Sequence, residues 1–184
     1  MAALAASSSS TEWSALDWQA FPPLYTLQPV AETRRQQLKV WVELVHHWAV
    51  SNGTFTFAPS GCGVFSNVEL NRALDAAGIE AVVAAVVADG RGEVLEDGQL
   101  FLMASRPVDV ARELYEWAKA SDKLGSVYTV LELYDADAAD DDCPCRGSDP
   151  RLVFKALGVL EDQDRCQVFH GATSSDAGVK FFRE

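Results

Sequence analysis

One order of elements occurs twice along this chain, and it constrains the fold more than any other feature. Each copy predicts a long helix with one apolar stripe, a short extended segment, two further helical segments and a closing hairpin. The first stripe consists of Leu38, Trp41, Val42, Val45, Trp48 and Ala49, and the second of Val108, Ala111, Leu114, Tyr115 and Ala118. This order is that of the winged-helix variant of the helix-turn-helix.

Several helix starts are marked by capping boxes, in which Ser or Thr is followed three residues later by Glu or Gln. The two side chains of such a box bond backbone N–H groups that would otherwise lack a partner. The boxes are Thr33 with Gln36, Ser66 with Glu69, and Thr129 with Glu132. They predict a long helix from Thr33, a short helix from Ser66 and a brief helix ending at Tyr134.

Short polar residues also mark the third helix of each copy and the hairpin after it. Asp75 can cap a helix that ends before Gly90, and Asp149-Pro150 begins the corresponding helix of the second copy. Asp97-Gly98 is a favoured pair for a two-residue hairpin turn. The second wing is predicted from strands at Cys166 to His170 and Val179 to Phe182, around the loop Ala172 to Gly178.

The fold class predicted from these signals is α+β, with two tandem winged-helix domains preceded by an extended proline-containing N-terminal arm. Hydrophobic residues make up 48% of the 184 residues, which is enough for two cores. The expected segments are a disordered N-terminus (1–20), an extended PPxY docking arm (21–32), winged helix 1 (33–105), and winged helix 2 (106–184) with an acidic insertion at 135–148.

The charge of the chain argues against nucleic acid and membrane as direct partners. The formal net charge of −12 repels phosphate and anionic lipid head groups. The third helix of the first copy has no Lys or Arg, and that of the second sets Arg151 and Lys155 against four acidic residues. No run approaches the roughly 20 apolar residues of a membrane-spanning helix, and no signal peptide is recognised, so we expect a cytoplasmic protein.

The possible metal ligands do not form a convincing site. Cys143, Cys145, Cys166 and His170 have the side-chain types that bind zinc. Cys166 and His170, however, lie four apart on a predicted strand, about 13 Å between Cα atoms, which is too far for one metal ion. We interpret these cysteines as loop and core residues.

Calcium binding and catalysis are not indicated either. The acidic insertion begins like a calcium loop, but Asp140 stands where the loop needs Gly and Arg146 where it needs Glu. The adjacent His46 and His47 point in different directions on a helix and cannot chelate together. No catalytic triad, phosphate-binding loop or nucleophile motif is present, so we expect no cofactor, no metal and no enzymatic activity.

The segment Phe21 to Pro29 holds three of the seven prolines together with large apolar side chains. Pro22-Pro23 predicts polyproline II geometry, and an extended, pre-ordered apolar strip loses little entropy when it docks in an aromatic-lined groove. Two alternatives stay open. The arm can pack back on its own domain, or the PPxY motif can be a free ligand for a WW domain, for instance in ubiquitin-ligase recruitment.

Motifs in matching order extend from the arm to the end of the chain. They are Phe21-Pro22-Pro23-Leu24-Tyr25-Thr26-Leu27-Gln28-Pro29, Thr33 to Leu38 with Trp41, Phe65 to Leu70, Arg106-Pro107, Leu114 to Trp117, Ser126 to Thr129, and Gly178 to Phe182. On these residues the chain resembles the small-subunit family of the ESCRT-II endosomal sorting complex, the vacuolar protein sorting-associated protein 25 family. Nearly the whole chain from Phe21 is covered.

The resemblance implies a non-enzymatic scaffold that acts in multivesicular body sorting of ubiquitinated cargo. Two copies would form the arms of a hetero-oligomer, each docking its PPxY-type motif on one of the two larger ESCRT-II core subunits. The second winged helix would recruit the ESCRT-III initiating subunit, and the chain would reach the endosomal membrane only peripherally, through its complex. By position, docking falls to Pro22, Pro23 and Tyr25, with Phe21, Leu24, Leu27 and Pro29 as flanking contacts.

The chain departs from the family pattern upstream of the arm. Where some relatives have a second proline-aromatic motif, this chain has Trp13 and Trp18, on which any upstream docking would rest. From a different class, a winged-helix nucleic-acid-binding or transcription-associated protein remains the competing hypothesis.

Overall fold

The computed structural model describes residues 18–171 and 176–183. Most of the N-terminal segment expected to be disordered, including Trp13, lies outside the described residues, as does part of the loop expected before Gly178.

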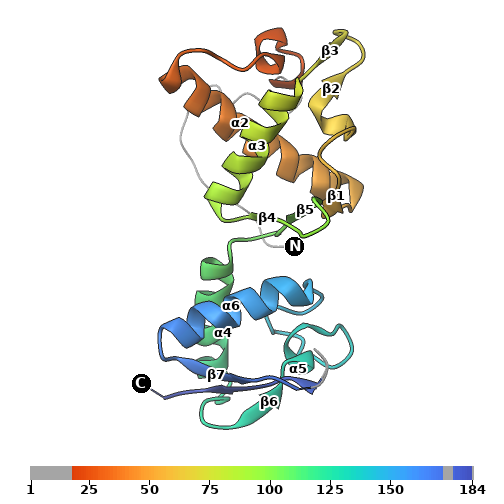
Figure 1. Cartoon of the computed structure of the whole chain (residues 1–184). Helices are drawn as coiled ribbons and strands as arrows, with labels where there is room; N and C mark the ends of the chain where they lie inside the picture. Colours follow the sequence, from red (N-terminus) through yellow and green to blue (C-terminus); the bar gives the residue numbers. More distant parts are fainter. Residues whose placement is uncertain (1–17, 172–175, 184) are drawn as a thin grey trace, which may run out of the picture. The chain divides into compact units, whose positions relative to one another are not determined.

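The chain divides between Leu102 and Met103 into two compact units, close to the division expected after residue 105 (Figure 1). Each unit contains a three-stranded antiparallel sheet and a set of helices. In both sheets the strand that comes last in the sequence lies in the middle, with orders β1-β5-β4 and β6-β8-β7. The repeated order of elements in the sequence is therefore matched by a repeated strand order.

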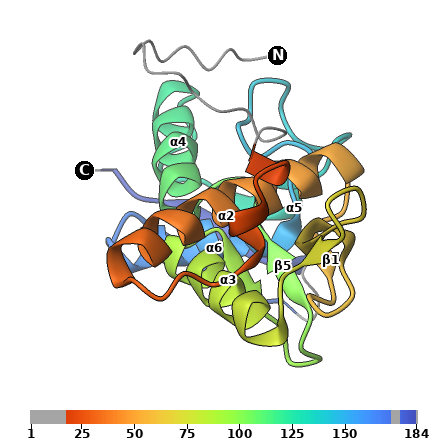
Figure 2. The ribbon, with the colours of Figure 1, turned by 90° about the horizontal axis from the view of Figure 1, so that it is seen from above.

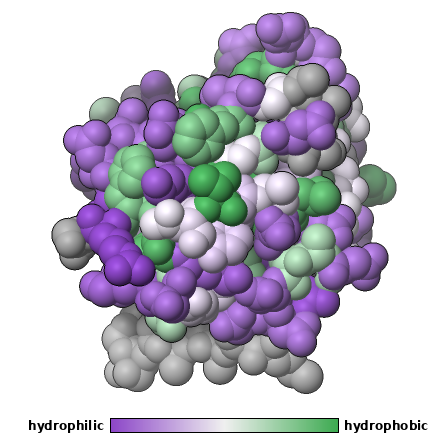
Figure 3. All heavy atoms as spheres, turned by 90° about the horizontal axis from the view of Figure 1, so that it is seen from below, coloured by the Kyte–Doolittle hydropathy of each residue, from purple (hydrophilic) through white to green (hydrophobic). Residues whose placement is uncertain are grey.

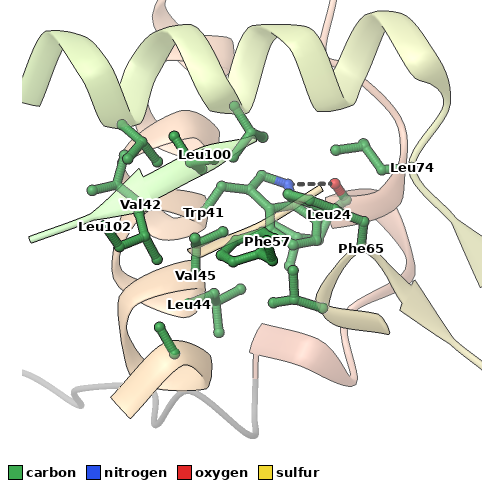
Figure 4. Close-up of a cluster of buried hydrophobic side chains, with 14 of the residues drawn as sticks. Leu24, Trp41, Val42, Leu44, Val45, Phe57, Phe65, Leu74, Leu100 and Leu102 are labelled. Carbon is green, nitrogen blue, oxygen red and sulfur yellow. Dashed lines mark hydrogen bonds between the residues drawn. The ribbon is translucent and has the colours of Figure 1, made fainter. Parts of the chain in front are cut away.

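The described part of the first unit contains the helices α2 and α3, the short 3₁₀ helices η1 and η2, and two small sheets. Its elements are η1 (Pro22–Tyr25), α2 (Ala31–Asn52), β1 (Thr56–Phe57), η2 (Gly63–Phe65), β2 (Ser66–Asn67), β3 (Arg72–Ala73), α3 (Ala76–Asp89), β4 (Gly92–Val94) and β5 (Leu100–Leu102). Helices α2 and α3 pack against each other (Figure 2). Trp41, Val45 and Leu100 lie in the core between these elements and are at most 1% exposed (Figure 4).

Helix α2 begins at Ala31, ahead of the capping box predicted at Thr33. Val30 is the N-cap and contributes no side-chain bond, while its carbonyl accepts a hydrogen bond from Arg34 N at 2.8 Å. The Arg34 side chain also donates to the carbonyls of Gln28, at 2.7 Å, and Pro29, at 3.3 Å. The predicted start is wrong, because the helix begins earlier in the sequence and Thr33 lies inside its first turn. The side chain of Arg34 bonds the backbone of the preceding arm and holds this earlier start in place.

The short helix predicted from Ser66 is also wrong, because this segment forms the antiparallel pair β2–β3. Ser66 pairs with Ala73, and the turn between the strands places Asn71 at a left-handed φ of 49°. The Asn67 side chain accepts a hydrogen bond from Leu70 N at 3.0 Å. This local bond competes with a helix for the same N–H group and fixes a turn instead.

The first wing is a hairpin with a longer connection than Asp97-Gly98 predicted. Leu95 N donates to the Gln99 carbonyl at 2.8 Å, and Gly98 N donates back to the Leu95 carbonyl at 2.9 Å. Gly98 has a left-handed φ of 79°. The loop therefore spans Glu96 to Gly98, with glycine at the one position that requires a left-handed backbone.

The second unit repeats the arrangement with regular helices throughout. Its elements are α4 (Pro107–Ala120), β6 (Val127–Thr129), α5 (Leu131–Tyr134), α6 (Pro150–Asp162), β7 (Cys166–Phe169) and β8 (Gly178–Phe181). Two predicted caps are present. Thr129 N and Oγ1 bond the Glu132 carboxylate at 2.7 and 2.8 Å, and Asp149 accepts a hydrogen bond from Arg151 N at 2.8 Å.

The acidic insertion at 135–148 forms a closed loop, since Gly147 N donates to the Tyr134 carbonyl at 2.7 Å. Cys143 and Cys145 are buried within it. Lys123 ties the loop to the domain through an ion pair with Asp140 at 2.7 Å. Its ammonium group also lies 4.8 Å from the ring centroid of Tyr128.

Candidate docking arm and its groove

The proline arm does not adopt the predicted polyproline II geometry. Pro22–Tyr25 forms the 3₁₀ helix η1, with Pro22 at its first position. Leu24 N donates to the Phe21 carbonyl at 3.0 Å, and Thr26 N donates to the Pro23 carbonyl at 3.3 Å. The φ angle that proline enforces suits both conformations, so the contacts of the following residues decide between them.

Leu24 and Tyr25 point into the first unit and are 3% and 4% exposed. Tyr25 packs edge-on against Trp41, with ring centroids 5.7 Å apart, and its hydroxyl donates to the Gln19 carbonyl at 3.1 Å. Burial raises the pKa of Tyr25 above its ordinary value, so the hydroxyl stays protonated at neutral pH. Leu24 and Tyr25 are therefore packed on their own domain, as one of the two alternatives expected, and they do not lie at the surface.

Gln37 fastens the backbone of the arm to helix α2. Its side-chain amide donates to the carbonyls of Leu24 at 2.8 Å and Thr26 at 2.9 Å, and its oxygen accepts from Gln28 N at 3.1 Å. Trp41 Nε1 adds a bond of 3.2 Å to the Leu24 carbonyl (Figure 4). Sequence reasoning missed Gln37. Its position could have been noticed in the sequence, because Gln37 lies one helical turn before Trp41 and next to the apolar stripe of the helix.

The outer side of the arm is formed by other residues of the predicted motif. Pro22, Pro23 and Pro29 are exposed, Leu27 is half-buried, and Phe21 is 38% exposed. Trp18 packs edge-on against Phe21, with ring centroids 6.0 Å apart. The seven predicted site residues thus divide into two inward anchors and five that lie partly or wholly at the surface.

A groove of ≈490 Å³ opens between the arm and the N-terminal half of α2. Trp18, Phe21 and Pro23 form its arm side, and Gln36, Lys39 and Val40 belong to the α2 side. This volume lies within the range of about 300 to 1,000 Å³ typical of sites that hold a small ligand or a few side chains. The arrangement can receive apolar groups of another molecule, with Lys39 available at the edge.

The described residues contain no group of three or more His, Cys, Asp or Glu side chains placed to hold a metal ion. Cys166 is buried on β7, whereas His170 is exposed just beyond that strand. His46 is buried and His47 exposed, as their adjacency on α2 predicts. Burial raises the pKa of the Cys166 thiol to about 12, so this sulfur stays protonated.

The helices that would read DNA in a nucleic-acid-binding winged helix are not basic here. The charged side chains of α3 are Glu80 and Asp89. On α6, Arg151 is paired with Asp149 at 3.0 Å. In the described part of the chain, no helix combines the length and apolar character needed to cross a membrane.

Two winged helices joined in one chain, with an N-terminal arm bonded to the first, define the class as tandem winged-helix proteins. A family model described as ESCRT-II complex subunit matches residues 19–143. The chain belongs to this family.

Similar proteins cover nearly the whole chain. Vacuolar protein-sorting-associated protein 25 of Homo sapiens is 30% identical over 179 residues, which cover 94% of this chain and 98% of the relative. The protein of that name from Arabidopsis thaliana is 30% identical over 164 residues, covering 88% and 91%. The predicted family resemblance is confirmed, and the chain is a complex subunit rather than an enzyme.

Solved structures support the fold. A crystal structure of subunit VPS25 of the endosomal trafficking complex ESCRT-II superposes with a TM-score of 0.72 at 21% identity, covering 89% of this chain and 96% of that one. A crystal structure of the endosomal complex ESCRT-II (VPS22/VPS25/VPS36) gives a TM-score of 0.69 at 22% identity, covering 92% and 100%. The predicted tandem winged-helix fold is confirmed.

Proposed function

We propose that this chain is a subunit of an ESCRT-II complex in endosomal trafficking and that its N-terminal arm docks on the two larger core subunits. The family match and the presence of VPS22 and VPS36 beside VPS25 in a related structure support this proposal. The single observation that carries the docking site is the arm itself, which is bonded to α2 through Gln37 and places Phe21, Pro22 and Pro23 outward.

In this proposal the arm residues have two roles. Leu24 and Tyr25 anchor the arm internally, so its backbone is ordered before the partner arrives. Phe21, Pro22 and Pro23 contact the partner, with Leu27 and Pro29 at the edge. Preorganisation of the arm reduces the entropy cost of binding. Exposed aromatic side chains near an apolar groove are common anchors of protein interfaces.

The remaining roles are proposed from the resemblance to the family. The second winged helix recruits the ESCRT-III initiating subunit, two copies of the chain are present in the complex, and the complex brings the chain to the endosomal membrane. In the second unit, Val127 on β6 and Phe169 on β7 are 61% and 42% exposed and both lie beside Gly178 of the central strand. Figure 3 shows apolar side chains set among hydrophilic ones on the face that it draws.

The docking role is tested with substitutions on the outer side of the arm. The variant Phe21→Ser, Pro22→Ala, Pro23→Ala is co-expressed with the two larger subunits and purified through a tag on one of them. We expect loss of co-purification, with the circular dichroism spectrum of the free chain unchanged. Val68→Ser, at a 91% exposed position of the same unit, serves as the control and should co-purify normally.

Co-purification of the triple variant at the level of the unsubstituted chain would contradict docking through the arm. Tyr25→Ala is unsuitable for this test, since it removes a core side chain and confounds lost docking with lost folding.

A further inference from the structure

Helix α3 has one broad apolar face, and only part of it is buried in the core. Val82 and Val86 point into the core and are 1% and 0% exposed. Ile79, Val83 and Val87 follow one another at a spacing of four residues along the outer edge of that face, where Ile79 and Val83 are half-buried against the core and Val87 is exposed. Folding buries one side of this apolar face, whereas its outer edge, which ends at the 42% exposed Val87, stays partly open to solvent.

Ile79, Val83 and Val87 form the floor of a groove of ≈670 Å³. Val94 of the wing and Pro59 of the loop before η2 contribute its walls. Val87 and Val94 are 42% and 49% exposed. The groove shares no lining residue with the one beside the docking arm, so it is a separate surface of the same unit.

The edge of the groove is acidic. Glu80 lies in its lining, and the hairpin tip that borders it at Gly98 carries Glu96 and Asp97. Asp97 bonds Gln99, whereas Glu80 and Glu96 have no ion-pair partner among the described residues. No Lys or Arg lines the groove. Its potential therefore repels phosphate and attracts cationic side chains.

We propose that this groove binds an amphipathic helix of a partner protein, with an apolar face and flanking Lys or Arg residues. Three apolar side chains at a spacing of four form a ridge about 12 Å long, which fits between the ridges of a second helix. The apolar face of the partner covers Ile79, Val83 and Val87, and its basic residues pair with Glu80 and Glu96. This inference goes beyond the docking arm and does not depend on it.

The experiment measures binding of a fluorescent synthetic peptide to the full chain by anisotropy. The peptide is an amphipathic helix with a Leu/Ile face flanked by Lys and Arg, and the comparison peptide has Glu at the flanking positions. We expect the basic peptide to bind, the acidic peptide to bind at least about tenfold more weakly, and binding of the basic peptide to weaken with salt.

Two substitutions locate the site. Val87→Lys places a charge on the floor and should weaken binding of the basic peptide at least about tenfold, and Glu80→Lys tests the edge charge alone and should also weaken it. Val68→Lys introduces the same residue and the same change of net charge as Val87→Lys, but away from the groove, and it should bind normally. Circular dichroism of each variant shows whether the fold is kept.

Three outcomes would overturn the proposal. They are no binding of the basic peptide at millimolar concentration, equal binding of the two peptides, and binding that Val87→Lys and Glu80→Lys both leave unchanged. Sedimentation of the free chain adds a further check: a dimer that Val87→Lys dissociates would assign the groove to a second copy of this chain instead.

Discussion

At the scale of single residues, Tyr25 is the position where motif and packing disagree. A PPxY motif predicts a tyrosine offered to a partner, yet here its ring lies against Trp41 and its hydroxyl bonds the Gln19 carbonyl. The Asn67 side chain donates to the same carbonyl at 3.0 Å across 48 positions of sequence. Tyr25 thus joins the arm, helix α2 and the β2–β3 turn, and its first role is in the stability of the unit.

Substitutions at Tyr25 should therefore change stability in two graded steps. Tyr25→Phe loses one hydrogen bond and should lower the free energy of unfolding by about 1 kcal/mol. Tyr25→Ala also leaves a cavity beside Trp41 and should lower it by about 3 to 5 kcal/mol. Urea denaturation followed by tryptophan fluorescence measures both, with exposed Val68→Ala as the control. Equal stability of Tyr25→Ala and the unsubstituted chain would show that the ring is not buried.

His46 should make the first unit sensitive to mild acid. Burial lowers its pKa most, the charge of Arg91 lowers it further, and Glu43 and Asp89 act in the opposite direction. Its Nε2 has no hydrogen-bond partner among the described residues. Because the folded chain holds His46 neutral and the unfolded chain binds the proton more readily, stability is full above about pH 6.5 and falls as the pH drops below it.

The measurement compares urea midpoints at pH 7.5 and 5.5 for the unsubstituted chain and for His46→Gln, which keeps a polar side chain without this titration. The unsubstituted chain should lose more stability than the variant on acidification. His47→Gln on the exposed side of α2 is the matched control and should behave like the unsubstituted chain. A loss identical in all three proteins would place the pH dependence elsewhere.

At the scale of elements, local side-chain hydrogen bonds determined which of the predicted capping boxes form. The capping boxes at Thr33 and Ser66 have the same form as the one at Thr129, but only the last forms in the structure. Arg34 bonds the arm backbone in the first case, and Asn67 bonds Leu70 N in the second. A capping-box sequence can start a helix, but it does so only where no competing local hydrogen bond forms.

The packing of the wing on α3 depends on a glycine. A Cβ atom built at Gly92 would lie 2.4 Å from Cγ1 of Val86, whereas one at Gly158, inside α6, would meet nothing within 4 Å. Gly92→Ala should destabilise the first unit by about 1 to 3 kcal/mol through overpacking. Gly158→Ala should stabilise the second unit by about 0.5 to 1 kcal/mol, since alanine favours a helix interior.

Thermal or urea unfolding of the two glycine variants gives both signs in one experiment. The unfolding midpoint is expected to fall for Gly92→Ala and to rise for Gly158→Ala. Because both variants add one methyl group, a general effect of added side-chain volume cannot explain opposite shifts. Destabilisation by Gly158→Ala, or no effect of Gly92→Ala, would contradict the packing described at these positions.

At the scale of the whole molecule, charge and burial argue against the two competing functions. The net charge of −12 and the acidic third helix of the first unit oppose binding to phosphate backbones. A WW domain needs the tyrosine of a PPxY motif to be accessible, and Tyr25 is 4% exposed. Among the described residues, neither a basic third helix in the first unit nor an accessible Tyr25 is found.

The WW hypothesis gives a direct prediction. An isolated WW domain that recognises PPxY peptides should bind a synthetic peptide of residues 18–29 and bind the folded full chain at least about tenfold more weakly, because Tyr25 must leave the core first. Titration calorimetry with both ligands measures this difference. A peptide with Tyr25→Ala is the negative control, and equal affinity for peptide and chain would show that the arm detaches freely.

The sequence by itself determined the family, the apolar stripes of α2 and α4, and the order of elements apart from the segment at Ser66, where the strands β2 and β3 replace a predicted helix. These features rest on periodicity and on motifs that are local in the chain. Only the tertiary structure decided that Pro22–Tyr25 is a 3₁₀ helix with Tyr25 inside, and that the outer edge of the apolar face of α3 lines a groove. The physical reason is that burial depends on residues far away in sequence, such as Trp41 and Asn67 for the arm, whose positions no local pattern specifies.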